Sequence, residues 1–150
     1  MCGIPASGKS YKAKELAERW EDCKYVSRDA VRFSLLSEKD EYFNKEKAVW
    51  KQYIAEIQEG ISNHLNTIAD ATHLNWASRK KLLDALRGLD MVAVNCYYFP
   101  TSLETCLRRN ALREGRARVP EKVIRNMYKN FTNPTFDPYD YHIIGEMINE

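Results

Sequence analysis

The sequence predicts a three-layer α/β/α sandwich around a short parallel sheet, in one domain that spans residues 1–150. Three observations carry this prediction. A complete phosphate-binding motif occupies residues 3–10, helical patterns alternate with short apolar runs along the rest of the chain, and 150 residues suffice for one hydrophobic core. In such a chain the strands are parallel, and ligands bind where their carboxyl ends lead into helices.

The motif at residues 3–10 is Gly-Ile-Pro-Ala-Ser-Gly-Lys-Ser, which matches G-x-x-x-x-G-K-[ST] at every fixed position. Its glycines allow a tight turn whose backbone N–H groups point at phosphates, and the helix that follows adds the positive end of its dipole. Lys9 is expected to meet the β- and γ-phosphates, and the Ser10 hydroxyl to bind Mg²⁺. The motif therefore predicts a site for ATP and Mg²⁺. The nucleotide contacts expected here are Gly3, Ser7, Gly8, Lys9, Ser10 and Tyr11.

Only Met1 and Cys2 precede this loop, which ordinarily follows the central strand of the sheet, so the first strand is apparently truncated. The strand that ends at Asp70 and the strand that begins at Met91 should flank the gap. Unpaired backbone groups there would cost about 1–3 kcal/mol each if buried without water. We therefore expect a further apolar segment before Met1, or one supplied by a tag or neighbouring chain. Otherwise the loop should be poorly formed and bind ATP weakly.

The first half of the chain contains two amphipathic helical patterns. An apolar face with Leu16 and Trp20 predicts a helix over residues 9–23. A longer helix is predicted over residues 44–65, where apolar side chains recur every fourth position between Val49 and Ile61. The other elements expected in this half are strands at 25–27 and 67–70 and a helix at 28–36.

The second half continues the alternation. Asn75 or Ser78 is suited to cap a helix over residues 76–89. The apolar run at 91–99 predicts the longest strand, and Pro120 suits the first turn of a late helix. The other elements expected are helices at 101–113 and 120–130, an irregular stretch at 133–139 and an edge strand at 141–148.

Composition is that of a globular domain, with 44% hydrophobic and 29% charged residues and a net charge of +2. Residues 103–130 contain eight Lys/Arg and three Glu, a local excess that suits a polyanionic substrate or a solvated helix face. No apolar run approaches the roughly 18 residues that span a membrane, and no signal peptide is visible. The four cysteines form no C-x-x-C pair. We therefore expect a cytoplasmic protein with reduced thiols and no membrane partner.

Two acidic residues are expected at strand ends. Asp29 in Ser-Arg-Asp-Ala-Val-Arg should face the nucleotide, where a carboxylate can accept the proton of an attacking hydroxyl, with Arg32 one helical turn on. It could instead simply cap a helix. Asp70 is similar to a carboxylate that holds Mg²⁺ through water. Thr72 and His73 follow in the loop where an acceptor would lie, although a lone loop histidine more often has no catalytic role.

The third candidate is an arginine-rich segment over residues 109–120, with Arg108 just before it. Five arginines lie within eleven residues around Gly115. Arginines on a closing lid can stabilise the charge that develops during phosphoryl transfer. The segment therefore predicts a lid, and the alternative is a solvated basic surface.

Together these motifs resemble the kinase domain of the phage-type 5′-polynucleotide kinases. Matching pieces beyond the phosphate loop are Ser-Arg-Asp-x-x-Arg at 27–32, Asp-x-Thr-x-Leu-Asn at 70–75, Arg-Asn-x-x-Arg at 109–113 and Val-Pro-x-x-Val-Ile-Arg-x-Met-Tyr-Lys at 119–129. The resemblance spans nearly the whole chain. It implies that Asp29 is the general base, Arg32 contacts an acceptor phosphate and Arg113 is the transition-state arginine. Arg109 and Arg116 are further nucleotide contacts.

The chain also departs from that pattern. One extra residue before Val119-Pro120 makes Arg116 a competitor of Arg113, and His73 stands where the family often has another polar residue. No Asp-x-Asp-x-Thr phosphatase motif is present.

The function predicted from the sequence is ATP-dependent phosphorylation of a hydroxyl, foremost the 5′-OH of DNA or RNA. Two other functions stay open. One is a kinase of a small metabolite or nucleotide-sugar, similar to zeta toxins or sugar kinases, and the other is a nucleotide-binding domain without turnover. The sequence leaves the oligomeric state open.

Overall fold

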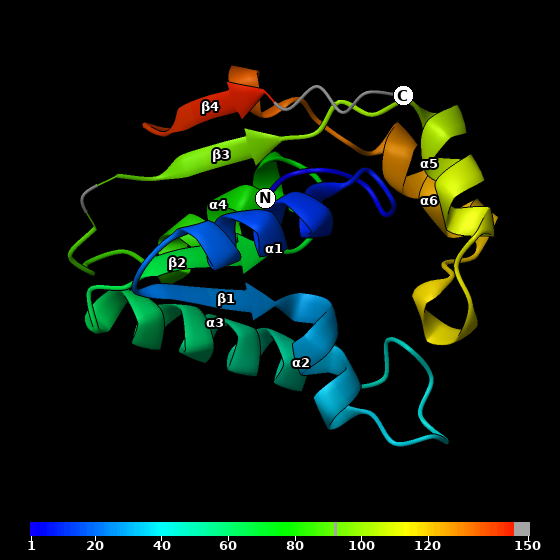
Figure 1. Ribbon diagram of the computed structural model, residues 1–150, viewed down its shortest axis with the longest axis horizontal. Helices are drawn as coiled ribbons and strands as arrows, with labels where there is room; N and C mark the ends of the chain where they lie inside the picture. Colours follow the sequence, from blue (N-terminus) through cyan, green and yellow to red (C-terminus); the bar gives the residue numbers. More distant parts are fainter. Residues whose placement is uncertain (92, 146–150) are drawn as a thin grey trace.

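The computed structural model describes residues 1–91 and 93–145, and its helices and strands alternate as predicted (Figure 1). Its strands are β1 (Cys23–Ser27), β2 (Asn66–Asp70), β3 (Asn95–Tyr98) and β4 (His142–Gly145). Its α-helices are α1 (Lys9–Arg19), α2 (Arg28–Leu35), α3 (Glu46–Ser62), α4 (Trp76–Ala85), α5 (Leu103–Ala111) and α6 (Glu121–Lys129). Short 3₁₀ turns occupy Gly115–Ala117 and Pro134–Phe136.

Apolar clusters on the two faces of the strands produce the three predicted layers. On one face, Val26 of β1 packs with Tyr53 and Ile57 of α3 and with Leu86 after α4. On the other face, an apolar stripe of α1 packs against Ile68 of β2 and neighbouring strand residues. A third cluster joins the phosphate-binding loop to α5 and α6. This arrangement confirms the α/β fold class and fixes the loop at one edge of the strands.

The strands form two parallel pairs, β1–β2 and β3–β4. Met1 and Cys2 lie between the pairs: the Met1 amino group donates to Ala69 O at 3.0 Å, and the Cys2 N–H donates to Tyr97 O at 2.8 Å. Phe99 N–H in turn donates to Cys2 O at 2.9 Å. The expectation that β2 and the strand after Met91 flank a short central segment is therefore confirmed. The two N-terminal residues serve as a stub of the central strand.

A cavity of about 500 Å³ continues from this stub between β2 and the chain before β3. We call it the strand groove. Its lining includes Met1, Trp20, residues 66–69, Met91 and residues 93–97. The predicted strand over 91–99 is reduced to Asn95–Tyr98, the residues that pair with β4, and Met1 and Cys2 add partners only for Tyr97 and Phe99. Residue 92 of that prediction, and residues 146–148 of the predicted edge strand, lie outside the described residues.

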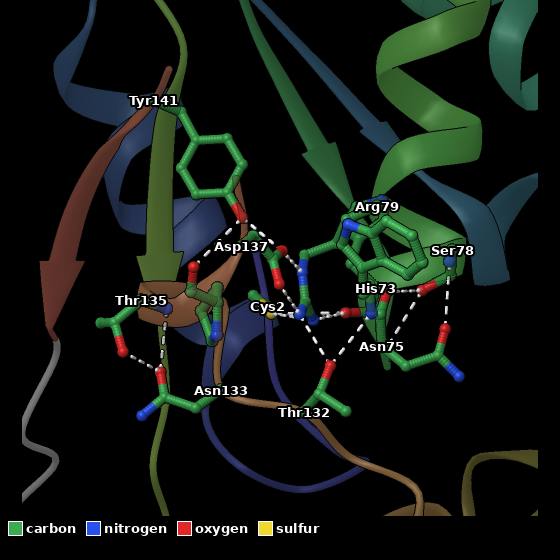
Figure 2. A network of polar contacts seen from close by, with 12 residues as sticks. Cys2, His73, Asn75, Ser78, Arg79, Thr132, Asn133, Thr135, Asp137 and Tyr141 are labelled. Carbon is green, nitrogen blue, oxygen red and sulfur yellow. Dashed lines mark hydrogen bonds and ion pairs between the residues drawn. The ribbon is translucent and has the colours of Figure 1, made fainter. Parts of the chain in front are cut away.

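A buried ion pair ties the C-terminal part of the chain to this region (Figure 2). Arg79 of α4 pairs with Asp137, which also accepts a hydrogen bond from Tyr141 OH at 2.5 Å. The same guanidinium donates to His73 O at 2.9 Å and to Thr132 Oγ1 at 2.9 Å. Helix α4 itself begins with a capping box in which Asn75 and Ser78 both take part, so the two predicted caps act together.

All four cysteines are free thiols. Among the helices within the described residues, none is both long and apolar enough to cross a membrane.

Candidate active site

The phosphate-binding loop at residues 3–10 is well formed despite the short central stub. Gly8 adopts a left-handed φ of 100° where the loop enters α1, a conformation that glycine adopts without steric cost. At Gly3 a Cβ atom would lie 2.6 Å from Ser7 Oγ and 3.1 Å from Phe99 Cβ, so only glycine fits this approach. Thr101 Oγ1 donates to Ser7 O at 2.8 Å and fixes the loop to the segment after β3. The loop is therefore formed in this structure beside the Met1–Cys2 stub, and weak ATP binding in the absence of a further segment stays a prediction.

Lys9 lies buried at the start of α1. Burial lowers the pKa of its amino group, while the nearby carboxylates of Asp70 and Asp29 act in the opposite direction and Arg113 adds to the lowering. The side chain thus sits among the charged residues that the sequence singled out. An incoming polyphosphate would add negative charge beside this desolvated ammonium and raise its pKa again.

Asp70 ends β2, and its two carboxylate oxygens have different surroundings. Oδ2 accepts a hydrogen bond from Tyr25 OH at 2.7 Å, whereas Oδ1 is buried without a hydrogen-bond partner. Such an oxygen, in the same cavity as Ser10, suits a hydrated Mg²⁺. Within the described part of the chain, no three His, Cys, Asp or Glu side chains could hold a metal by themselves. The donor set therefore fits a Mg²⁺ ion whose other ligands are phosphate oxygens and water.

Asp29 lies in the first turn of α2, directly after β1. Ser27, not Asp29, caps this helix, since its hydroxyl accepts from Ala30 N–H at 3.2 Å. Asp29 Oδ1 accepts from Arg32 Nη1 at 2.5 Å and from Tyr42 OH at 2.8 Å. Oδ2 makes no hydrogen bond within the described residues. The carboxylate is thus held by one oxygen, while the other is available to a substrate.

Arg32 is buried, and it contacts two carboxylates and a tyrosine of the protein. Besides Asp29, it donates to Glu46 Oε1 from Nε at 3.0 Å and to Tyr42 OH at 2.9 Å. Its guanidinium also lies over the Tyr42 ring, 4.4 Å from the ring centre. The prediction that Arg32 binds an acceptor phosphate therefore finds no support in its surroundings, because its charge is already balanced by two carboxylates.

The lid arginines differ from Arg32 in this respect. In residues 1–91 and 93–145, no carboxylate forms an ion pair with Arg113, Arg116 or Arg118. Arg113 Nη1 donates to Ala117 O at 3.4 Å within the lid. Arg116 Nη2 reaches across to Ser37 O at 3.0 Å and Glu38 O at 3.2 Å, in the loop after α2. In this state Arg116 holds the lid against that loop.

These groups line one cavity of about 670 Å³, which we call the active-site pocket. It lies at the carboxyl ends of β1 and β2, as parallel strands predict. Among the predicted site residues, it brings together Lys9, Ser10, Asp29, Arg32, Asp70, Thr72, Arg113 and Arg116. The sequence did not indicate Tyr42 and Glu46, because they reach the pocket from a loop and a helix start that carry no motif.

Six predicted site residues do not line this pocket: Gly3, Ser7 and Gly8 belong to the phosphate-binding loop beside it, and the other three lie elsewhere. Tyr11 is exposed on α1 and Arg109 belongs to α5, and neither lines the active-site pocket. His73 is buried beside the strand groove, with Nδ1 2.5 Å from Met1 O and Nε2 3.3 Å from Tyr53 OH. Burial lowers the pKa of His73 to about 3, so it is neutral near pH 7. Its position gives no support to a substrate contact and indicates a structural role.

A phosphate-binding loop, a strand-end carboxylate beside it and an arginine-rich segment on an α/β sandwich define a kinase-like P-loop domain. Comparison with known families agrees. Residues 1–134 match the AAA_33 family model, described as an AAA domain, and the chain belongs to that family.

The individual proteins that this chain is similar to carry names that refer to different substrates or assemblies. The chain is 29% identical over 140 residues to an L-seryl-tRNA(Sec) kinase of Methanococcus maripaludis, which covers 89% of this chain. The chain spans about half (52%) of that relative's length. A chain in a structure of the Pnkp1/Rnl/Hen1 RNA repair complex superposes with a TM-score of 0.71 at 20% identity, over 86% of this chain and 42% of its own. A gluconokinase from Sinorhizobium meliloti 1021 superposes with a TM-score of 0.59 at 16% identity, and the match covers 96% of this chain and 79% of the gluconokinase. At these identities the two structures establish the fold.

Proposed function

We propose that this chain transfers the γ-phosphoryl group of ATP to a hydroxyl at the 5′ end of a DNA or RNA strand. The observation that carries the proposal is the shared pocket: Lys9 and Ser10 of the phosphate-binding loop line the same cavity as the Asp29 carboxylate. A nucleotide bound on the loop would direct its terminal phosphate toward the side on which Asp29 can activate an acceptor.

The reaction needs little covalent chemistry from the protein. The acceptor hydroxyl gives its proton to Asp29 Oδ2 as its oxygen bonds to the γ-phosphorus, and the bond from that phosphorus to the ADP oxygen breaks. Lys9 and Arg113 stabilise the negative charge that builds up on the transferring phosphoryl oxygens. When bound through Ser10 and Asp70, Mg²⁺ would supply additional positive charge to the phosphates.

The charge pattern favours a polyanionic acceptor. Arg113, Arg116 and Arg118 all line the pocket and are not neutralised by carboxylates in the described chain. Uncompensated arginines at a pocket mouth attract phosphate groups, and arginine binds them in two-pronged fashion. Two of the similar proteins, the tRNA kinase and the RNA repair chain, carry names that refer to RNA, which supports the same acceptor class.

A small-molecule acceptor is the second candidate. The likeness to a gluconokinase supports it, as do the contacts of Arg32 with Asp29 and Glu46, which engage this arginine within the protein. A sugar hydroxyl would not need a phosphate contact there. A nucleotide-binding domain without turnover remains the third possibility.

An acceptor panel with radiolabelled ATP separates these functions. We expect label on 5′-OH DNA or RNA oligonucleotides and none on 5′-phosphorylated ones of the same sequence. Seryl-tRNA, gluconate and mononucleosides complete the panel. Label only on seryl-tRNA or only on gluconate would replace the 5′-end proposal, and ATP binding without label on any acceptor would support the domain without turnover.

A further inference from the structure

We propose that the loop of residues 36–45 is a brace that couples closure of the lid to the positioning of Asp29, with Tyr42 as the positioning residue and Arg116 as the latch. This inference rests on the proposed function, because it assigns Asp29 the role of proton acceptor. It adds residues that no sequence motif contains, and it gives Arg116 a role other than binding nucleotide.

The first part of the brace is the contact between Tyr42 and Asp29. An aspartate in an exposed first helical turn can adopt several rotamers, and the Asp29 side chain is 64% exposed. Tyr42 OH and Arg32 Nη1 both donate to Oδ1, which leaves Oδ2 toward the pocket. Burial and the nearby Asp29 carboxylate raise the pKa of Tyr42, so its hydroxyl stays protonated as a donor.

Tyr42 is itself held by its neighbours. Its ring packs edge-on against Phe33 of α2 at 6.2 Å and against Phe43 at 4.7 Å between ring centres, and it stacks under the Arg32 guanidinium. The hydroxyl position is therefore set by the loop that carries the ring.

The second part of the brace is the turn at residues 37–40, to which Arg116 donates hydrogen bonds. Asp40 Oδ2 accepts from Ser37 N at 2.8 Å and from Ser37 Oγ at 2.9 Å, and it pairs with Lys45 at 3.0 Å. These contacts lower the pKa of Asp40 and keep it ionised. Lys45 Nζ also donates to Leu35 O at 2.7 Å, which closes the base of the loop. These internal contacts make the turn stiff. A displacement of Ser37 and Glu38 should therefore also displace Tyr42.

Arg116 connects the lid to this turn. Its two hydrogen bonds to the carbonyls of residues 37 and 38 join segments that are nearly 80 positions apart in the sequence. Arg118 lies two residues further along the same lid and lines the same pocket, but no hydrogen bond joins its side chain to this loop among the described residues. Arg116→Ala and Arg118→Ala therefore offer a matched test. A general effect of lid charge would appear in both variants, whereas loss of the contact with the loop of residues 36–45 would appear only in Arg116→Ala.

The test compares Tyr42→Phe, Arg116→Ala, Arg118→Ala and the double variant Tyr42→Phe/Arg116→Ala. Loss of a hydrogen bond to a charged group should lower kcat about tenfold in Tyr42→Phe, with the KM for ATP unchanged. Arg116→Ala should lower kcat by a similar factor, and the double variant should fall no further than about either single one, since both interrupt one pathway. Arg116→Lys, which can still donate to a carbonyl, should recover part of the loss.

Hydrogen–deuterium exchange provides a readout that does not depend on activity. Amides of residues 36–45 should exchange faster in Arg116→Ala and at the wild-type rate in Arg118→Ala. Unchanged exchange in Arg116→Ala, unchanged kcat in Tyr42→Phe, or full additivity in the double variant would overturn the brace. Wild-type protein that labels no acceptor would instead refute the proposed function, and the exchange comparison would still decide the latch.

Discussion

The two cavities of this domain differ in what lines them: the active-site pocket lies at the carboxyl ends of β1 and β2, and the strand groove runs between β2 and the chain that leads into β3. The active-site pocket, of about 670 Å³, is lined by charged side chains, of which Arg28, Arg32, Asp29 and Glu46 pair with one another. Its unpaired groups, such as Asp70 Oδ1, are the ones that a nucleotide and Mg²⁺ would engage. The strand groove, of about 500 Å³, is lined mainly by apolar side chains and strand backbone beside the Met1–Cys2 stub. The first cavity has the composition of a ligand site, and the second that of an incompletely packed sheet.

The largest effect should come from Lys9→Ala in the active-site pocket. We expect kcat/KM to fall by about 10³-fold or more, because the ammonium faces the phosphates directly. The melting temperature should barely change, since burial already disfavours the charged form of Lys9. Lys14→Ala, an exposed lysine on the same helix, is the control and should retain activity. Normal ATP turnover in Lys9→Ala would refute the assignment of the loop.

Asp29→Asn should have the next largest effect. Asparagine keeps an oxygen for Tyr42 and Arg32 but cannot take up the acceptor proton. Phosphoryl transfer should fall by about 10²- to 10⁴-fold, while the Kd for ATP stays within a few-fold of wild type. Transfer rates and equilibrium ATP binding measured on the same preparation would check this. A loss of ATP binding instead would make Asp29 a metal-binding or structural residue.

Filling the strand groove should stabilise the fold. Five apolar, β-branched residues added before Met1 would convert its buried amino group, whose pKa burial lowers, into an amide that still donates to Ala69 O. We expect the melting temperature to rise by roughly 3–6 °C and ATP affinity to rise with it. Five Gly/Ser residues at the same place are the matched control. Equal melting temperatures for the two extensions would mean that the groove does not accept a strand.

A pH dependence of the free energy of unfolding should come from His73, beside the groove. Its pKa is about 3 in the folded protein and about 6.5 when unfolded, so the unfolded state binds more protons between these values. The stabilisation is complete above pH 6.5 and is lost as pH falls toward 3, by up to about 1.4 kcal/mol per pH unit. Urea unfolding measured between pH 4 and 7 should show that the free energy of unfolding depends less steeply on pH in His73→Gln than in the wild-type protein. His64→Gln, at an exposed turn, should keep the wild-type slope.

Sequence patterns predicted the active-site pocket better than the strand groove. Lys9 and Asp29 were identifiable because a motif or a strand end fixes where the backbone puts them. The sequence did not indicate which way neighbouring loop side chains point. Thr72 lines the active-site pocket, whereas His73, one residue on, lines the strand groove. Nor could the sequence show that Glu46 pairs with Arg32, since that contact depends on how α2 packs against α3.

The shortened strand β3 has a similar explanation. The apolar run at 91–99 carries the propensity for a long strand, but a strand also needs a neighbour along its length. β4 provides such a neighbour along residues 95–98, and Met1 and Cys2 provide another only near Tyr97 and Phe99. Local sequence cannot report such a missing partner.

The Arg79–Asp137 pair has a consequence for where this domain can be cut. The family match ends at residue 134, yet Asp137, whose side chain is 4% exposed, neutralises a guanidinium that also holds the backbone of His73 (Figure 2). A fragment trimmed to the matched residues would keep every group that lines the active-site pocket and still leave a buried cation without its carboxylate. Breaking a buried pair in this way costs about 3–5 kcal/mol, a large part of the stability of an ordinary domain. A stable fragment of this domain should therefore extend at least to Asp137.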